Sequence, residues 1–484
     1  MAYKTILLQV AIGLSLFFGC KTAKEDVHSI EKIENSLTPA LVINGIHTEP
    51  LTLADAMKEH NVPAVSIAFF DNGSIQWKKT YGSTTSSNGA VIDDHTLFQA
   101  ASISKPVSAL GAMRLSQENN LDINEDLNIY LDEWKLQNST FKNSDKATLK
   151  DILSHSGGIT VSGFGGYDTG SQIPSLTQIL NGEAPANSKP IIQDTTAGSL
   201  WRYSGGGFVI LQKIMEDVSD IPFEEYMQLK VLTPMKMTSS TFAQYDPETN
   251  NKNIAIGHDG QGEPIRGKWK VHPEKAAAGL WTTPSDLALF AISIQKAYAG
   301  EKQSIVSESI AKKMLENQFD GWGLGMDISN KDGILRMLHG GSNSGYRCQL
   351  VAEANLGQGV VIMTNGDGGE TVIQDLLRSI SSHYNWNIYK PKEKTVITLS
   401  DTEKSKLIGR FSMSGNDQVV AEITASAIGL NVSQTWDGQS YLILPESESL
   451  FFRNTDGVPI EFLTNDTGEI TGLIAGGELS FNKL

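Results

Sequence analysis

Hydrophobic and polar residues alternate with different periods along this chain, and each period predicts a different element. Residues 62–82 alternate on both sides of a turn-forming Asp-Asn-Gly, which predicts two strands in a hairpin. Apolar residues at helical spacing over 102–119, 285–300 and 369–386 predict three helices. Alternation returns in segments that we expect to be strands of one sheet, namely 333–340, 345–353 and 359–367.

The pattern changes towards both ends and divides the chain into parts. After a charged linker at residues 391–400, residues 401–484 show short alternating runs, which are typical of an all-β module such as a small barrel. The segment 46–390 mixes helical patterns, strands and glycine-rich loops, and is predicted to be the main domain. Residues 20–45 are polar and are predicted to form a tether in front of it.

The first residues have the character of a targeting segment. Lys4 precedes an apolar run, ILLQVAIGLSLFFGC, which is too short for a comfortable membrane span and stops at Cys20. This arrangement resembles a bacterial lipoprotein signal, in which residues 1–19 are removed and Cys20 becomes the lipidated first residue. The resemblance implies a protein of the cell envelope that is anchored to a membrane by lipid, at the outer membrane or on a periplasmic or surface face. An ordinary secretory signal and an uncleaved anchor are the alternatives.

Composition narrows the classes of partner. The chain of 484 residues is 40% hydrophobic and 19% charged, as globular proteins are, and its formal net charge is −16. A chain this acidic has no general attraction for nucleic acid. Cys20 and Cys348 are its two cysteines. A lipidated Cys20 would therefore leave no disulfide, and the hydrophobic core must stabilise the fold.

Candidate chemistry begins with Ser102 and Lys105, at the start of a predicted helix. The spacing stacks both side chains on one helical face, and free N–H groups there favour a developing oxyanion. The surrounding AASISKPVSAL is small and apolar, so it can keep the lysine uncharged and able to take the serine proton. The alternative is a helix-capping serine with a solvated lysine. The same spacing recurs at Ser29, Ser139, Ser293, Ser309 and Ser480.

Two glycine-rich stretches carry further candidates. Tyr203 precedes Ser204 and three glycines ahead of a helix, and these glycines would let a backbone or a substrate approach closely. Farther on, a strand ends in His339, and the residues after it would pair with an extended substrate and offer an N–H to an oxyanion. Each stretch by itself is equally consistent with packing under a loop or with a hairpin turn.

Taken in order, FQAASISKP, YSGGG and HGG resemble the three signature motifs of the serine β-lactamase and penicillin-binding-protein superfamily, most closely its class C β-lactamase-related branch. LKDILSHSGGI, AGSLWRYS and AAAGLWTTPSDLALF are similar to the same family, so the resemblance covers residues 52–387. It implies an α/β (α+β) β-lactamase/transpeptidase-like fold, with an antiparallel sheet flanked by helices and a helical subdomain. The C-terminal module is similar to the lipocalin-like barrels appended to some of these hydrolases.

The resemblance also implies roles for individual residues. Ser102 is expected to be the acylated nucleophile, Lys105 its activating base, and Tyr203 the group that shuttles protons to the leaving group and to water. The backbone N–H groups of Ser102 and Ser342 are expected to form the oxyanion hole, and His339 to hold an anionic or polar end of the substrate. The residues expected to bind the oxyanion or the substrate are Ser102, Gly205, His339, Gly340, Gly341 and Ser342.

One position departs from the family and shapes the expected activity. Relatives usually carry the motif Tyr-x-Asn, and this chain has Gly205 at the position of the asparagine. The missing asparagine argues against efficient β-lactam hydrolysis more than against acyl transfer. We therefore expect a serine hydrolase that acts through an acyl-enzyme on ester, amide or D-amino-acid peptide substrates. The alternative is a catalytically weakened protein that binds cell-wall peptides or β-lactams, or a surface adaptor.

Other hydrolase chemistries fit the sequence poorly. The chain has no Gly-x-Ser-x-Gly elbow, which argues against an α/β-hydrolase. Its nine histidines include no His-x-His and no His-Glu-x-x-His, and a Walker-type phosphate loop is absent. We therefore expect no metal and no organic cofactor, and a small-molecule or short-peptide substrate.

Overall fold

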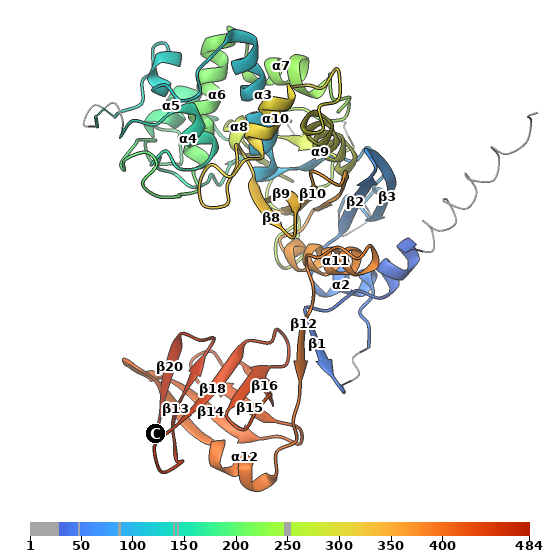
Figure 1. Ribbon diagram of the computed structural model, residues 1–484, viewed down its shortest axis with the longest axis vertical. Coiled ribbons are helices and arrows are strands. Elements are labelled where there is room, and N and C mark those ends of the chain that lie inside the picture. The colour runs from blue at the N-terminus through green and yellow to red at the C-terminus, as the bar shows by residue number, and fades with distance from the viewer. Residues whose placement is uncertain (1–28, 47–48, 86–88, 139–140, 143–144, 246–252) are drawn as a thin grey trace, which may run out of the picture. The chain divides into compact units, whose positions relative to one another are not determined.

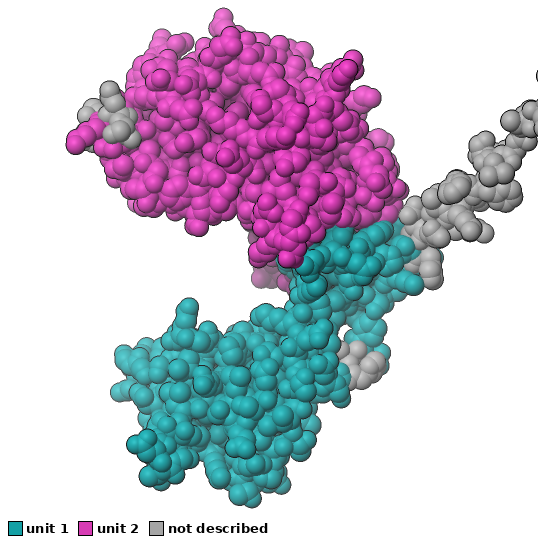
Figure 2. All heavy atoms as spheres, in the orientation of Figure 1, with its two compact units in different colours: residues 1–53, 374–484 teal, residues 54–373 magenta. Residues whose placement is uncertain are grey.

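Figure 1 shows the course of the chain in the computed structural model. The described residues are 29–46, 49–85, 89–138, 141–142, 145–245 and 253–484. The chain divides into two compact units, one of residues 54–373 and one of residues 1–53 and 374–484 (Figure 2). The predicted signal at 1–19 and Cys20 lie outside the described residues. No helix in the described ranges is long and apolar enough to cross a membrane.

The larger unit, residues 54–373, is built on an antiparallel sheet of six strands in the order β3-β2-β11-β10-β9-β8. The predicted hairpin and the three predicted sheet strands are all present in it, so these predictions are confirmed. Helix α9 (Pro284–Tyr298) packs on β2, β3 and β11 and covers one face. The strands are β2 (Ala64–Asp71), β3 (Ser74–Gly82), β8 (Asp327–Lys331), β9 (Ile334–Asn343), β10 (Tyr346–Glu353) and β11 (Gln358–Thr364).

Most helices of this unit gather on one side of the sheet, as Figure 1 shows. This arrangement has the helical subdomain beside an antiparallel sheet that the resemblance implies. The other helices that lie mostly in this unit are α2 (Leu53–Glu59), α3 (Ser104–Asn119), α4 (Leu149–Leu153), α5 (Leu176–Asn181), α6 (Gly205–Ser219), α7 (Phe223–Met227), α8 (Lys275–Ala278) and α10 (Glu308–Met314). Helix α11 (Gly369–His383) begins in this unit, and its residues 374–383 belong to the smaller unit. Short strand pairs are β4 (Phe98–Gln99) with β7 (Trp281–Thr282), and β5 (Tyr167–Asp168) with β6 (Lys270–Val271).

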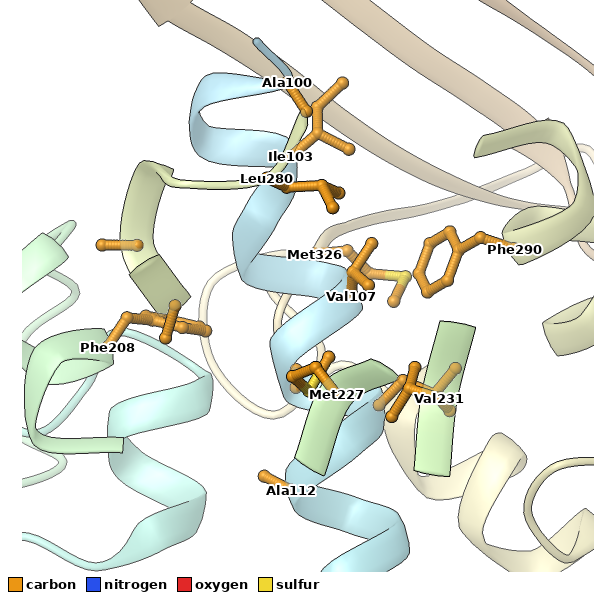
Figure 3. Packing of buried hydrophobic residues seen from close by; sticks show 14 of the residues in the cluster. Ala100, Ile103, Val107, Ala112, Phe208, Met227, Val231, Leu280, Phe290 and Met326 are labelled. Carbon is orange, nitrogen blue, oxygen red and sulfur yellow. The ribbon is translucent and has the colours of Figure 1, made fainter. Parts of the chain in front are cut away.

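Helix α3 runs through the middle of the helical part. Its residues 104–113 are all buried, which is typical of a helix enclosed on every side. Figure 3 shows Val107 on this helix packed with Met326 and Phe290 in one hydrophobic cluster. The helix starts at Ser104 rather than at the predicted residue 102, because η1 (Ala101–Ile103) forms a tighter 3-10 turn in front of it.

The smaller unit contains a closed barrel of eight strands, which confirms the predicted C-terminal β-module. Its interior holds a hydrophobic core in which the ring of Phe462 lies 5.9 Å from that of Phe411 and 5.3 Å from that of Phe451. The barrel strands are β13 (Gly409–Met413), β14 (Asn416–Ala425), β15 (Leu430–Gln434), β16 (Ser440–Pro445), β17 (Leu450–Arg453), β18 (Pro459–Thr464), β19 (Ile470–Ala475) and β20 (Leu479–Lys483).

Two short strands of this unit lie where the sequence predicts a tether and a linker. They are β1 (Leu41–Asn44) and β12 (Lys392–Thr395), and they pair in parallel. Four residues are too few for an alternation to stand out in the sequence, and their pairing joins positions about 350 residues apart. Helix α12 (Asp401–Leu407) precedes the barrel and is capped by Ser400.

Candidate active site

Ser102 lies in the middle of the 3-10 turn η1, on a backbone that is locally strained. Ala101, just before it, has a φ of 48°, which costs energy for a residue with a Cβ. Neighbouring groups hold this conformation, because the Ser104 hydroxyl donates to the Ala101 carbonyl oxygen (2.6 Å) and accepts from the Leu280 N–H (3.0 Å). The turn therefore presents Ser102, which is half-buried, in a fixed orientation.

Lys105 is brought into direct contact with Ser102, as the spacing predicts. Its Nζ lies 3.0 Å from the Ser102 Oγ and 2.9 Å from the carbonyl oxygen of Ala277 in α8. The side chain is only 2% exposed, and its Nζ lies 4.8 Å from the ring centre of Tyr203 and 5.9 Å from that of Phe208. Lys105 thus has one carbonyl partner, two aromatic faces and the serine hydroxyl around its amine.

Tyr203 reaches this cluster from the segment that leads into α6. Ser204 caps the helix by accepting a hydrogen bond from the Gly207 N–H (2.9 Å), which fixes the chain where Tyr203 leaves it. The Ser204 N–H donates to Nδ1 of His155 (3.1 Å), and the His155 ring lies 4.3 Å from the Tyr203 ring. The structure therefore places the Tyr203 ring next to both Lys105 and His155.

Strand β9 packs tightly on the serine turn. A Cβ atom at Gly341 would lie well inside 3.0 Å of the Ala100 carbonyl oxygen and of Cys348 Sγ, so a glycine is required for this close approach. The Cys348 thiol on β10 also donates to the Ala100 carbonyl oxygen (3.0 Å). Gly340 and Ser342 flank Gly341 and are exposed on the other face of the strand. The strand edge predicted to bind substrate thus lies next to the turn that carries Ser102.

His339 lies on the same strand, but it is 5% exposed and does not project freely into solvent. Its Nδ1 is 2.6 Å from the carbonyl oxygen of Gly340, and its ring centre lies 6.3 Å from that of Tyr203. Burial lowers the pKa of His339 to about 3, and the charge of Lys105 acts in the same direction. The ring is therefore neutral at neutral pH.

Sequence reasoning missed two residues that contact this cluster. His155 is 2% exposed, and burial, followed by Lys105 and His339, holds its pKa well below the ordinary value. Trp322 lies with its ring 5.0 Å from that of His155, 5.7 Å from that of His339 and 6.0 Å from that of Tyr203. His155 belongs to the family-like stretch LKDILSHSGGI, and Trp322 stands between two glycines in DGWGLG. These two stretches could be noticed in the sequence, but neither indicates which distant side chains His155 and Trp322 contact in the folded protein.

Gly205, the position that departs from the family, lies at the first residue of α6 and is buried. A Cβ there would be 3.1 Å from the Phe164 ring and 3.1 Å from the Ser162 carbonyl oxygen. The loop of Ser162 and Phe164 therefore occupies the space that a side chain at this position would need.

Two further buried ionisable residues precede α8. His272 is 1% exposed and Glu274 is fully buried, and neither side chain has a hydrogen-bond partner among the described residues. Burial lowers the pKa of His272 to about 4 and raises that of Glu274 to about 7. Both groups therefore favour their uncharged forms.

No group of three or more histidine, cysteine, aspartate or glutamate side chains in the described ranges is arranged to hold a metal ion. The groups gathered around Lys105 and Tyr203 are a serine hydroxyl, an amine, a phenol, two imidazoles and an indole. Such a set is suited to proton transfer and to binding a developing oxyanion.

The sequence is similar to those of known proteins over most of the larger unit. The sequence profile described as Beta-lactamase matches residues 52–383. Protein flp of Staphylococcus aureus (strain N315) is 24% identical over 330 residues, which cover 64% of this chain and 61% of that protein. The Teichoic acid D-alanine hydrolase of Staphylococcus aureus is 25% identical over 233 residues, or 48% of this chain and 54% of the relative. The chain thus spans less than two thirds of the length of either.

Solved structures show the same fold. The octameric penicillin-binding protein homologue from Pyrococcus abyssi superposes with a TM-score of 0.59 at 20% identity, covering 89% of this chain and 98% of that one. At this identity the likeness concerns the fold alone.

Proposed function

The chain belongs to the Beta-lactamase family, and from this premise we propose that it is a serine hydrolase that forms an acyl-enzyme on Ser102. The observation that supports the proposal best is the 3.0 Å contact between the Ser102 Oγ and the Nζ of a lysine that is 2% exposed. A serine hydroxyl is a weak nucleophile by itself, and an adjacent uncharged amine is a suitable base for it.

In the proposed reaction, the Ser102 Oγ forms a bond to the substrate carbonyl carbon while Lys105 takes the hydroxyl proton. The proton passes to the leaving group, by way of Tyr203, as the bond between the carbonyl carbon and the leaving group breaks. The oxygen of a water molecule then forms a bond to the acyl carbon, and the water gives one proton to the same groups. The bond between the acyl carbon and the Ser102 Oγ breaks, and that proton restores the serine hydroxyl. Protons therefore balance over the cycle, and no other co-reactant is needed.

The negative charge that develops on the carbonyl oxygen is proposed to be bound by the backbone N–H groups of Ser102 and Ser342. The close packing of Gly341 on the Ala100 carbonyl oxygen supports this, because it holds β9 beside the serine turn. Fixed N–H donors stabilise an oxyanion strongly, and losing one usually costs on the order of 10²–10³ in rate.

We propose ester, amide or D-amino-acid peptide substrates. The name of one relative, a Teichoic acid D-alanine hydrolase, supports substrates that carry a D-alanyl or similar acyl group. The loop of Phe164 that fills the space beside Gly205 argues against efficient turnover of β-lactams with an acylamide side chain. It also motivates the second candidate, a weakened relative that binds such ligands without turning them over.

We also propose that the protein is exported and held in the cell envelope by lipid on Cys20. The lipoprotein-like sequence up to Cys20 supports this. Metabolic labelling with a fatty-acid analogue tests it, because Cys20→Ala should abolish incorporation and leave the rest of the chain intact.

Intact-mass spectrometry after treatment with a fluorophosphonate tests the proposed nucleophile. One adduct per chain is expected, located on Ser102 and absent in Ser102→Ala. Ser309→Ala is the matched control, because Ser309 has the same spacing to a lysine but lies exposed on α10. An adduct that persists in Ser102→Ala would overturn the assignment, and absence of labelling with retained binding of penicillin would favour the second candidate. Turnover of a p-nitrophenyl ester, nitrocefin and a D-Ala-D-Ala peptide then ranks the substrate classes.

A further inference from the structure

Two histidine rings lie beside Tyr203, and one nitrogen of each ring stands out by its hydrogen bonding. His155 Nε2 and His339 Nε2 are buried and have no hydrogen-bond partner among the described residues. Their ring centres are 4.3 Å and 6.3 Å from that of Tyr203. Buried polar atoms are usually paired, so two such atoms in one cluster beside a reactive serine point to a ligand.

The partner of the other nitrogen fixes which form each imidazole takes. Nδ1 of His339 faces the carbonyl oxygen of Gly340 at 2.6 Å, and a carbonyl can only accept, so Nδ1 carries the proton. Because the ring is neutral, its Nε2 has a lone pair and no hydrogen. His339 therefore presents a hydrogen-bond acceptor to the cluster.

His155 has the opposite assignment. Its Nδ1 accepts from the Ser204 N–H at 3.1 Å, so the proton of the neutral ring lies on Nε2. The cluster thus offers one acceptor and one donor, and neither is charged. The basic side chain of the cluster, Lys105, is already in contact with the serine hydroxyl and with a carbonyl oxygen.

Aromatic faces complete the surroundings of these two nitrogens. The Trp322 ring lies 5.7 Å from that of His339 and 5.5 Å from that of Trp201, which is 36% exposed at the edge of the cluster. Trp322 Nε1 is a third buried polar atom with no partner in the described part of the chain. Flat apolar faces beside uncharged donors and acceptors suit a polyhydroxy compound, whose C–H groups pack on rings while its hydroxyls form hydrogen bonds.

We infer that the Nε2 atom of His339 accepts a hydrogen bond from a hydroxyl of the substrate's leaving group, so that the enzyme prefers esters of hydroxylated alcohols over esters whose leaving group ends in a carboxylate. This rests on the proposed function, in which Tyr203 protonates the leaving group and so places that group beside His339. A carboxylate has no hydrogen to donate, so it cannot pair with the Nε2 lone pair of His339, and its negative charge would lie against that lone pair. A leaving group that ends in an alkyl group would leave Nε2 of His339 without a hydrogen-bond partner. A site built to bind a hydroxyl strongly disfavours substrates that lack it.

Three esters of butyric acid test this inference, because they differ only at the far end of the leaving group: 2-hydroxyethyl, propyl and carboxymethyl butyrate. Each kcat/KM is divided by the rate of hydroxide-catalysed hydrolysis to remove intrinsic reactivity. We expect the hydroxyethyl ester to exceed the propyl ester by about tenfold or more, as an unpaired buried group implies, and the carboxymethyl ester to be the poorest. For weak turnover, protection of Ser102 from the fluorophosphonate ranks the same esters.

Variants of His339 identify the atom responsible. His339→Leu removes the acceptor and should abolish the hydroxyethyl preference, whereas His339→Gln keeps an acceptor oxygen and should retain part of it. His339→Lys introduces a cation and should make the carboxymethyl ester the best of the three. His95→Lys is the matched control, because His95 is exposed and outside the cluster, and should leave the ranking unchanged. Thermal unfolding of each variant verifies that it folds.

The outcomes separate the inference from the proposed function. Labelling of Ser102 together with equal use of the three esters, or a wild-type preference for the carboxymethyl ester, would overturn the inference alone. So would an unchanged ratio in His339→Leu. If Ser102 is neither labelled nor acylated by any ester, the proposed function is overturned, and this inference with it.

Discussion

Replacing Gly341 by alanine tests whether strand β9 and the serine turn work as one unit. The added methyl group would lie well inside 3.0 Å of the Ala100 carbonyl oxygen and of Cys348 Sγ, whereas ordinary contacts of a Cβ begin near 3.4 Å. Neither neighbour is the free end of a flexible side chain. The strand and the turn must therefore move apart, and with them the proposed oxyanion donors at Ser102 and Ser342.

The size of the effect follows from this geometry. A displacement of about 1 Å between reacting groups can lower a rate on the order of 10²-fold. Overpacking a well-packed interior also costs about 1–3 kcal/mol of unfolding free energy. For Gly341→Ala we expect the acylation rate of Ser102 to fall about 10²-fold or more, with a stability loss that still leaves the chain folded.

The assay combines two measurements on the same samples. Time-resolved intact-mass spectrometry gives the rate at which a fluorophosphonate or an ester acylates Ser102, and urea unfolding gives the stability. Gly359→Ala is the matched control, because a Cβ at Gly359 on β11 would be equally crowded, by the Phe70 ring and the Val351 carbonyl oxygen. That variant should lose stability but acylate at the wild-type rate.

Wild-type acylation in Gly341→Ala, with unfolding as cooperative as that of Gly359→Ala, would refute the reasoning. It would mean that the position of β9 relative to the serine turn does not limit the reaction. Equal rate losses in both variants would instead indicate a general effect of destabilisation.

Four further predictions concern the proposed base, the position that departs from the family motif, and two buried ionisable groups. Lys105→Arg should slow acylation by about 10²-fold or more, because a guanidinium stays charged and cannot take the serine proton; a wild-type rate in the mass assay would exclude Lys105 as the base. Gly205→Asn should lower the unfolding free energy by about 1–3 kcal/mol through overpacking, and adding Phe164→Ala should restore part of it in urea unfolding. Because burial raises the pKa of Glu274 from 4.5 to about 7, the native carboxyl keeps its proton longer than the unfolded one, so the contribution of Glu274 to stability falls as pH rises through that window; relative to the wild type, Glu274→Gln should gain stability as pH rises there. Burial lowers the pKa of His272 from 6.5 to about 4, so the unfolded chain binds the proton first and the contribution of His272 to stability falls as pH drops through that window, opposing that of Glu274; a difference in stability between His272→Gln and the wild type that does not change with pH would contradict this.

Local elements could be predicted because their signals are short-range. The period of two in residues 62–82 and the helical period after Ser102 act over a few residues, and both became the expected strands and helix. The start of α3 was misplaced because a 3-10 turn has no distinct hydrophobic pattern, and the pair β1 and β12 was missed because each strand has four residues.

The site itself was only partly predictable. The spacing of Ser102 and Lys105 brings them together within one helical turn, so the sequence alone indicates their contact. His155 and Trp322 meet the cluster from segments about 50 and 220 residues away from Ser102, and no local signal indicates such a meeting.

The sequence by itself determined the order of the motifs, the alternation of the sheet and barrel strands, and the serine–lysine spacing, because these depend on the chain's own periodicity. The tertiary structure decided which side chains surround Lys105, which nitrogen of each buried imidazole carries a proton, and why Gly341 admits no side chain. Those properties depend on burial and on hydrogen-bond partners that distant segments supply, and the interactions of a buried polar group are strong because water no longer competes for it.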